Sequence, residues 1–133
     1  MSVQRAVAFF TILIVILVVA AAFMVLGSPS RERAEALDRQ RIADLRREAQ
    51  DLAERYKATS ALPPGRLSDP KHDPVSGRAY GYRRIAATKY ELCATFQRSS
   101  AKIEDPVLDD GTFWRHPPGE ACYEFDARSP VPH

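Results

Sequence analysis

An uninterrupted run of apolar residues near the N-terminus is the strongest pattern in the chain. Residues 6–26 (AVAFFTILIVILVVAAAFMVL) are apolar except for Thr11. About 21 helical residues rising about 1.5 Å each span about 31 Å, which matches a hydrocarbon core of about 30 Å. We therefore expect a short N-terminal segment at 1–5 and a transmembrane anchor at 6–27. A cleaved signal peptide and a buried core helix are the alternatives, and the signal's apolar region is usually shorter, about 7–15 residues.

A second helix is predicted directly after this segment. Gly27–Ser28–Pro29–Ser30 interrupts the apolar run, and residues 31–57 then contain neither Gly nor Pro. Apolar residues recur there at gaps of three and four, which makes one stripe on an otherwise charged helix. The stripe consists of Ile42, Leu45, Ala49, Leu52 and Tyr56. It indicates packing on a sheet of the same chain, with a coiled-coil seam of about two heptads as the alternative.

Three strands are predicted after a turn-rich connection at 58–78. They cover residues 79–85, 89–97 and 120–126, and the last two alternate apolar and polar side chains. The apolar faces of the strands can meet the helix stripe in a two-layer core. The expected fold is therefore α+β: an N-terminal transmembrane helix, then a long amphipathic helix packed on a small three-stranded antiparallel sheet. This domain is expected at 28–126, followed by a disordered tail at 127–133.

The two cysteines lie on the polar faces of the last two predicted strands. If the strands pair, Cys93 and Cys122 point to the same side, as a cross-strand disulfide requires. Two free thiols or half of a metal site are the alternatives. A disulfide would also place the domain outside the reducing cytosol.

Composition and charge exclude several classes of function. The chain has 133 residues, and the apolar run supplies about a third of its 45% hydrophobic residues, so the remaining domain is polar with a small core. A net charge of +2, with acidic residues interleaved among the basic ones, gives no nucleic-acid footprint. Neither a G-x-S-x-G motif nor a Gly-rich phosphate loop occurs. We therefore expect a non-enzymatic protein without a cofactor.

Metal-ligand patterns are weak. The histidines His72, His116 and His133 lack H-x₃-H spacing, and there is no CxxC motif, so no metal site is expected. A mixed site of His116 with the cysteines competes with the disulfide for the same sulfurs. An acidic loop partly resembles a calcium loop without matching its full pattern. The weak calcium candidates are Asp105, Asp109 and Asp110.

Three segments together resemble a known family. Residues 73–82 (DPVSGRAYGY), 90–96 (YELCATF) and 114–123 (WRHPPGEACY) follow an apolar helix and an amphipathic helix. This arrangement resembles type IV pilin-like proteins, in particular the major pseudopilin of type II secretion. It is similar still more closely to uncharacterised single-pass bacterial proteins with such a C-terminal domain. Phe9 and Ile14 stand where pilin precursors carry Gly and Glu, so the resemblance implies the domain fold rather than a processed filament subunit.

The side of the membrane is predicted from two opposing signals. Four arginines follow the apolar run and only Arg5 precedes it, which by itself would keep the domain in the cytoplasm. Long domains translocate largely regardless of charge, and the cysteine pair favours the periplasm. We expect a single-pass inner-membrane protein with a periplasmic pseudopilin-like domain that has a structural or protein-interaction role, involving Trp114 and the helix stripe. Its expected partners are the lipid bilayer and other membrane or envelope proteins. The alternative is a periplasmic small-ligand or calcium-binding module using the loop 105–119.

Overall fold

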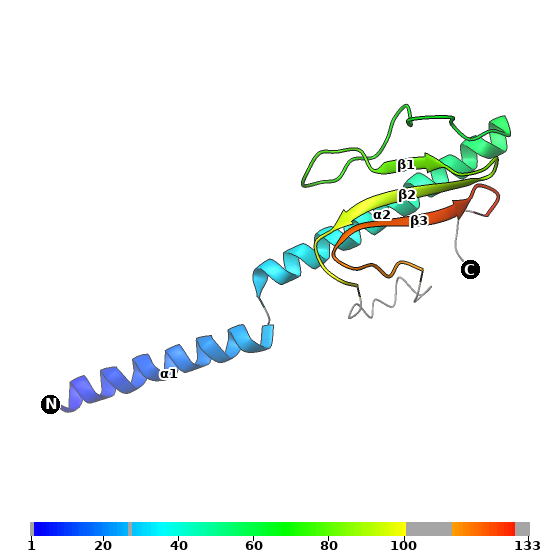
Figure 1. The fold of residues 1–133 in the computed structure, drawn as a ribbon. Helices are drawn as coiled ribbons and strands as arrows, with labels where there is room; N and C mark the ends of the chain where they lie inside the picture. Colours follow the sequence, from blue (N-terminus) through cyan, green and yellow to red (C-terminus); the bar gives the residue numbers. More distant parts are fainter. Residues whose placement is uncertain (1, 27, 101–112, 130–133) are drawn as a thin grey trace. The chain divides into compact units, whose positions relative to one another are not determined.

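The computed structural model describes residues 2–26, 28–100 and 113–129. The chain divides into two compact units, residues 1–33 and 34–133. The elements are the helices α1 (Val3–Leu26) and α2 (Pro29–Thr59) and the strands β1 (Gly81–Arg84), β2 (Lys89–Phe96) and β3 (Gly119–Asp126) (Figure 1). The predicted α+β fold is confirmed.

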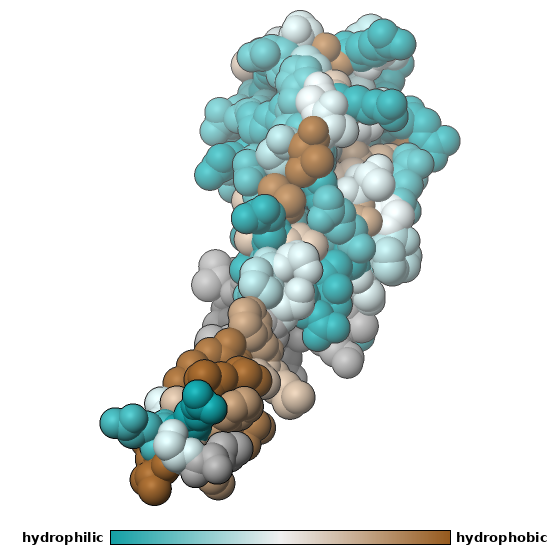
Figure 2. All heavy atoms as spheres, turned by 90° about the vertical axis from the view of Figure 1, so that its left-hand side faces the viewer, coloured by the Kyte–Doolittle hydropathy of each residue, from teal (hydrophilic) through white to brown (hydrophobic). Residues whose placement is uncertain are grey.

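Helix α1 is formed by the apolar run. Its large side chains are exposed, as Phe9 (69%) and Leu17 (60%) illustrate. Figure 2 shows this brown apolar surface, which contrasts with the mostly teal surface of the sheet domain in the same view. Among the described residues, α1 contains the one stretch that is long and apolar enough to cross a membrane.

Helix α2 begins at a residue suited to a first helical turn. Pro29 occupies the first helical position, where its missing N–H and fixed φ cost nothing. The carbonyl of Ser28 accepts hydrogen bonds from the N–H groups of Arg31 and Glu32 at 2.9 and 3.2 Å. The helix thus begins two residues earlier than predicted and ends two residues later, at Thr59.

The sheet is antiparallel in the order β1-β2-β3, and α2 lies along one of its faces (Figure 1). The predicted stripe faces this sheet: Ile42, Leu45 and Leu52 are at most 2% exposed, and Tyr56 packs at the core margin. Strand β2 contributes the inward side chains and β3 adds an aromatic pair. These core residues are Tyr90, Leu92, Ala94, Phe96, Tyr123 and Phe125. The helix stripe is therefore covered by the chain's own sheet.

Strand β2 ends one residue earlier than predicted and β3 begins one residue earlier. Two further boundaries differ because side chains and loops bind the chain elsewhere. The first strand is only Gly81–Arg84, because the Tyr80 N–H donates to the Lys71 carbonyl at 3.1 Å rather than to β2. At the other end, the tail does not begin at residue 127. Ala127 is fully buried and its N–H donates to the Thr88 carbonyl at 2.8 Å. The ordered domain therefore continues past 126, and residues 130–133 lie outside the described part.

Candidate functional site

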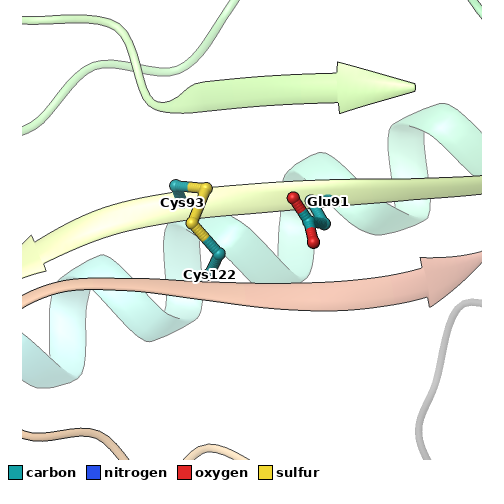
Figure 3. A group of neighbouring side chains, drawn as sticks. All are labelled: Glu91, Cys93 and Cys122. Carbon is teal, nitrogen blue, oxygen red and sulfur yellow. A yellow bond between two sulfur atoms is a disulfide. The ribbon is translucent and has the colours of Figure 1, made fainter. Parts of the chain in front are cut away.

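The outer face of the sheet, opposite α2, carries the cysteine pair. Cys93 on β2 lies directly across from Cys122 on β3, with Cα atoms 4.0 Å apart, and the two sulfurs form a disulfide. Figure 3 shows both side chains on the side of the sheet away from α2, with Glu91 beside them. Cys122 is exposed and Cys93 half-buried, so solvent reaches the bond. The predicted cross-strand geometry is confirmed.

Charged residues surround the disulfide on this face. Glu91 lies two residues before Cys93 and accepts a hydrogen bond from Arg83 Nε at 3.0 Å. Glu124 lies directly opposite Glu91 and pairs with Lys89 Nζ at 2.7 Å. Two carboxylates in opposed positions repel each other, and the two cations offset this repulsion. The outer face is thus a polar surface with a sulfur pair at its centre.

Close approach of β1 to this sulfur pair depends on a glycine. Gly81 lies opposite Cys93, and a Cβ at position 81 would lie 3.0 Å from Cys93 Cβ. A contact of this length is tighter than nine in ten real Cβ contacts, so Cys93 would have to shift by a few tenths of an ångström. The GYRR strand therefore begins with the residue type that fits beside the disulfide without moving Cys93.

An open cleft of about 500 Å³ adjoins the same region. Its walls are the 73–80 segment and the ends of β1 and β2, and it includes Arg41, Arg78, Thr95 and Glu120. Cys93 also lines it, so the cleft and the sulfur pair form one continuous feature. The lining is mixed in charge, which does not select for one sign of ligand.

A buried ionic cluster lies beneath this cleft. The carboxylate of Asp38 on α2 accepts Arg41 Nη1 at 2.7 Å and the backbone N–H of Arg98 at 2.8 Å. Arg41 Nε also pairs with Asp73. The Arg41 guanidinium, with the backbone N–H groups of Ser76 and Val75, holds the pKa of Asp73 well below its usual range, against the desolvation that raises it. The cluster ties α2 to the 73–78 turn and to the end of β2.

The two tyrosines at the end of the segment 73–82, Tyr80 and Tyr82, also hold parts of the domain together. The hydroxyl of Tyr80 donates to Asp44 on α2 at 3.1 Å, and burial raises its pKa far above the usual value. The hydroxyl of Tyr82 donates to the Pro63 carbonyl at 2.9 Å. The segment 73–82 thus attaches the long connection between α2 and β1 to helix α2, through Tyr80, and to an earlier part of the same connection, through Tyr82.

The segment before β3 covers the end of the core. Trp114 is 5% exposed and packs on Tyr123, with ring centroids 4.9 Å apart. His116 stacks on Phe96, with ring centroids 3.7 Å apart. Its Nε2 is buried and has no hydrogen-bond partner among the described residues. Burial lowers the pKa of His116, so the ring favours the neutral form. Trp114 therefore fills the core.

The remaining predicted site residues divide into two groups. The calcium candidates Asp105, Asp109 and Asp110 lie outside the described residues, so the structure does not test them. His116 does not approach the cysteines closely enough to share a ligand group with them: among the described residues, the one metal-competent cluster is Glu91, Cys93 and Cys122.

Sequence reasoning missed the buried charges of α2. Asp38, Arg41 and Glu48 are at most 5% exposed, although the apolar stripe alone was predicted to face the sheet. A signal was present, because these positions fall at helical spacing beside the apolar stripe.

Comparisons with protein-family models, curated proteins and solved structures found no match. The function of the chain is therefore inferred from its own sequence and structure.

Proposed function

We propose that this chain is a non-enzymatic, single-pass protein of the bacterial inner membrane that presents a small pseudopilin-like domain to the periplasm. One combination of features supports the proposal: an exposed apolar helix of membrane-spanning length and a disulfide-linked domain in the same chain. The helix needs an apolar surrounding, because about 25 cal/mol is gained for each Å² of apolar surface removed from water. The disulfide is stable in an oxidising compartment and not in the reducing cytosol.

The way in which the polar residues are used supports a structural or protein-interaction role. The buried acids Asp38 and Glu48 and the half-buried Asp73 each accept hydrogen bonds from neighbouring backbone or from Arg41. Hydrogen bonds of this kind hold segments of the domain together, which is a structural use of the carboxylates. The outer sheet face and the adjoining cleft are then the surfaces offered to envelope partners.

Thiol labelling in intact bacteria tests the compartment. The cells are treated with a membrane-impermeant maleimide before and after reduction, and the wild-type pair should react only after reduction. Two added cysteines report the sides of the membrane. Ala61→Cys lies at an exposed position of the sheet domain and should label without reductant, whereas Ser2→Cys, exposed at the opposite end of α1, should stay protected. Labelling of Ser2→Cys with protection of Ala61→Cys would overturn the orientation.

Extraction tests the anchor. Alkaline carbonate should leave the full chain in the membrane pellet, with α1 intact by mass. Release into the supernatant, or a mass that lacks α1, would contradict a retained membrane span and favour a cleaved signal.

A further inference from the structure

We propose that reduction of the Cys93–Cys122 disulfide converts the outer sheet face into a zinc site made by the two thiolates and Glu91. In the described residues, the ligand atoms of these three side chains lie within 4.8 Å of one another. The inference goes beyond the proposed function, because it concerns the reduced chain on either side of a membrane. The disulfide and the metal then exclude each other.

The sheet register supplies the geometry. Cys93 and Cys122 are directly opposed, and Glu91 lies two positions along β2 on the same face (Figure 3). A tetrahedral zinc ion with Zn–S bonds of about 2.3 Å holds its sulfurs about 3.8 Å apart. Once the S–S bond is broken, rotation of the exposed Cys122 side chain can provide that spacing. Glu91 has three side-chain torsions with which to bring one oxygen to the ion.

The donor set selects the metal. Two thiolates and a carboxylate suit a borderline-soft ion such as Zn²⁺, and do not suit Ca²⁺ or Mg²⁺, which prefer six or more oxygens. Three protein ligands leave the fourth position for water on this solvent-facing side. The oxidised chain offers no thiolate, so it lacks the two strongest ligands.

The reaction balances with a dithiol as the reductant. Thiol–disulfide exchange passes two electrons and two protons to the Cys93–Cys122 bond, giving two thiols, while the dithiol closes to its own disulfide. Zn²⁺ then displaces one proton from each thiol, forming two Zn–S bonds and releasing two protons.

Arg83 is the competitor for the carboxylate. Its Nε donates to Glu91 Oε2 at 3.0 Å, and its side chain is 73% exposed. An exposed ion pair of this kind is weak, so zinc can displace the guanidinium. Arg83 therefore lowers the affinity of the site, and removal of its charge should raise it.

The test uses the full chain in detergent micelles, reduced with a dithiol that is then removed without oxygen. Co²⁺ is the spectroscopic probe, because thiolate ligation gives a sulfur-to-metal charge-transfer absorption, and Zn²⁺ competition gives the affinity. We expect one ion per reduced chain and no charge-transfer absorption with the oxidised chain. Glu91→Gln should weaken binding about tenfold or more, and Arg83→Ala should tighten it.

Glu120→Gln is the matched control. Glu120 is an exposed glutamate on the same face of β3, two residues before Cys122, but outside the ligand group. It should bind as the wild-type chain does. An equal loss in Glu120→Gln and Glu91→Gln would mean that the acidic face attracts the ion without a defined site, which overturns the proposal.

Folding of the reduced chain is followed by Trp114 fluorescence in the same samples. If reduction keeps Trp114 buried, absence of the charge-transfer absorption refutes the site. If reduction unfolds the domain, added Zn²⁺ should restore the buried emission, since a ligand that binds the native state stabilises it. Failure to restore it would equally refute the proposal.

Discussion

Removal of the Asp38 carboxylate is the sharpest test of how the sheet domain is held together. Asp38→Ala leaves Arg41, whose side chain is 4% exposed, with Asp73 as its remaining partner, and deprives the backbone N–H groups of Gln97 and Arg98 of their acceptor. Breaking a buried ion pair by removing one partner costs about 3–5 kcal/mol. Each unsatisfied buried donor costs about 1–3 kcal/mol, although these costs overlap. We expect a loss of about 4 kcal/mol, a large part of the 5–15 kcal/mol typical of a domain.

Urea unfolding in detergent micelles measures this loss. Trp114 is the one tryptophan in the chain and is buried in the core, so its emission reports on the sheet domain and not on α1. With a denaturant slope of about 2 kcal/mol per molar, the midpoint should fall by about 2 M.

A matched variant separates burial from charge. Asp51→Ala removes the same side chain from the same helix, but Asp51 is 53% exposed, and its ion-pair partner among the described residues is Lys71. Such a pair contributes about 0–1 kcal/mol. Asp38→Asn, which keeps one acceptor oxygen, should fall between the two. If the free energies of unfolding of Asp38→Ala and Asp51→Ala differ by less than about 1 kcal/mol, the proposed contribution of the buried cluster is refuted.

Three further outcomes are expected from the same assay. The double variant Cys93→Ala/Cys122→Ala should lose about 3–4 kcal/mol, because the disulfide closes a loop over a separation of 29 residues; an unchanged midpoint would contradict this. Gly81→Ala should lose about 1–3 kcal/mol, since its Cβ would press on Cys93; equal stability would show that β1 moves away at little cost. The pKa of His116 is lowered by burial from its ordinary 6.5, so the unfolded chain binds the proton more readily. The contribution of His116 to stability should therefore be fully present above about pH 6.5 and fall as the pH drops below it, and His116→Gln should remove this dependence. A slope that persists in His116→Gln would assign the effect to other groups.

Local patterns in the sequence were sufficient for several elements. The apolar run predicted α1, and the stripe from Ile42 to Tyr56 predicted the buried side of α2, because burial of one helix face imposes a 3.6-residue period. Strict alternation in 89–97 fixed which side of β2 faces the helix. The same alternation placed Cys93 on the outer face and allowed its pairing with Cys122.

The sheet edge and loop geometry needed the tertiary structure. Strand β1 lacks the first two residues of the predicted strand 79–85, because Tyr80 turns toward α2 and its hydroxyl donates to Asp44. It also lacks the last predicted residue, Ile85, whose N–H donates to the Lys89 carbonyl in the hairpin turn. Ala127 was assigned to a disordered tail, yet its N–H binds the Thr88 carbonyl in the hairpin turn and its side chain is fully buried. Tyr80 and Ala127 are held by partners at least 36 positions away in the sequence. A local pattern of apolar and polar residues contains no information about such distant partners.

What the sequence by itself determined is the partition of the chain into an apolar helix and a helix-on-sheet domain, since burial of apolar surface leaves a periodic trace in the residue order. What only the tertiary structure decided is the fate of the charges. In the sequence, Asp38 and Arg41 look like residues of a solvated helix face. In the fold, the residues that follow β2 supply backbone donors to Asp38, and the 73–78 turn supplies a carboxylate acceptor to Arg41, from 32 to 60 residues away. A charge can be buried only where such partners converge, and their convergence is a property of the folded chain.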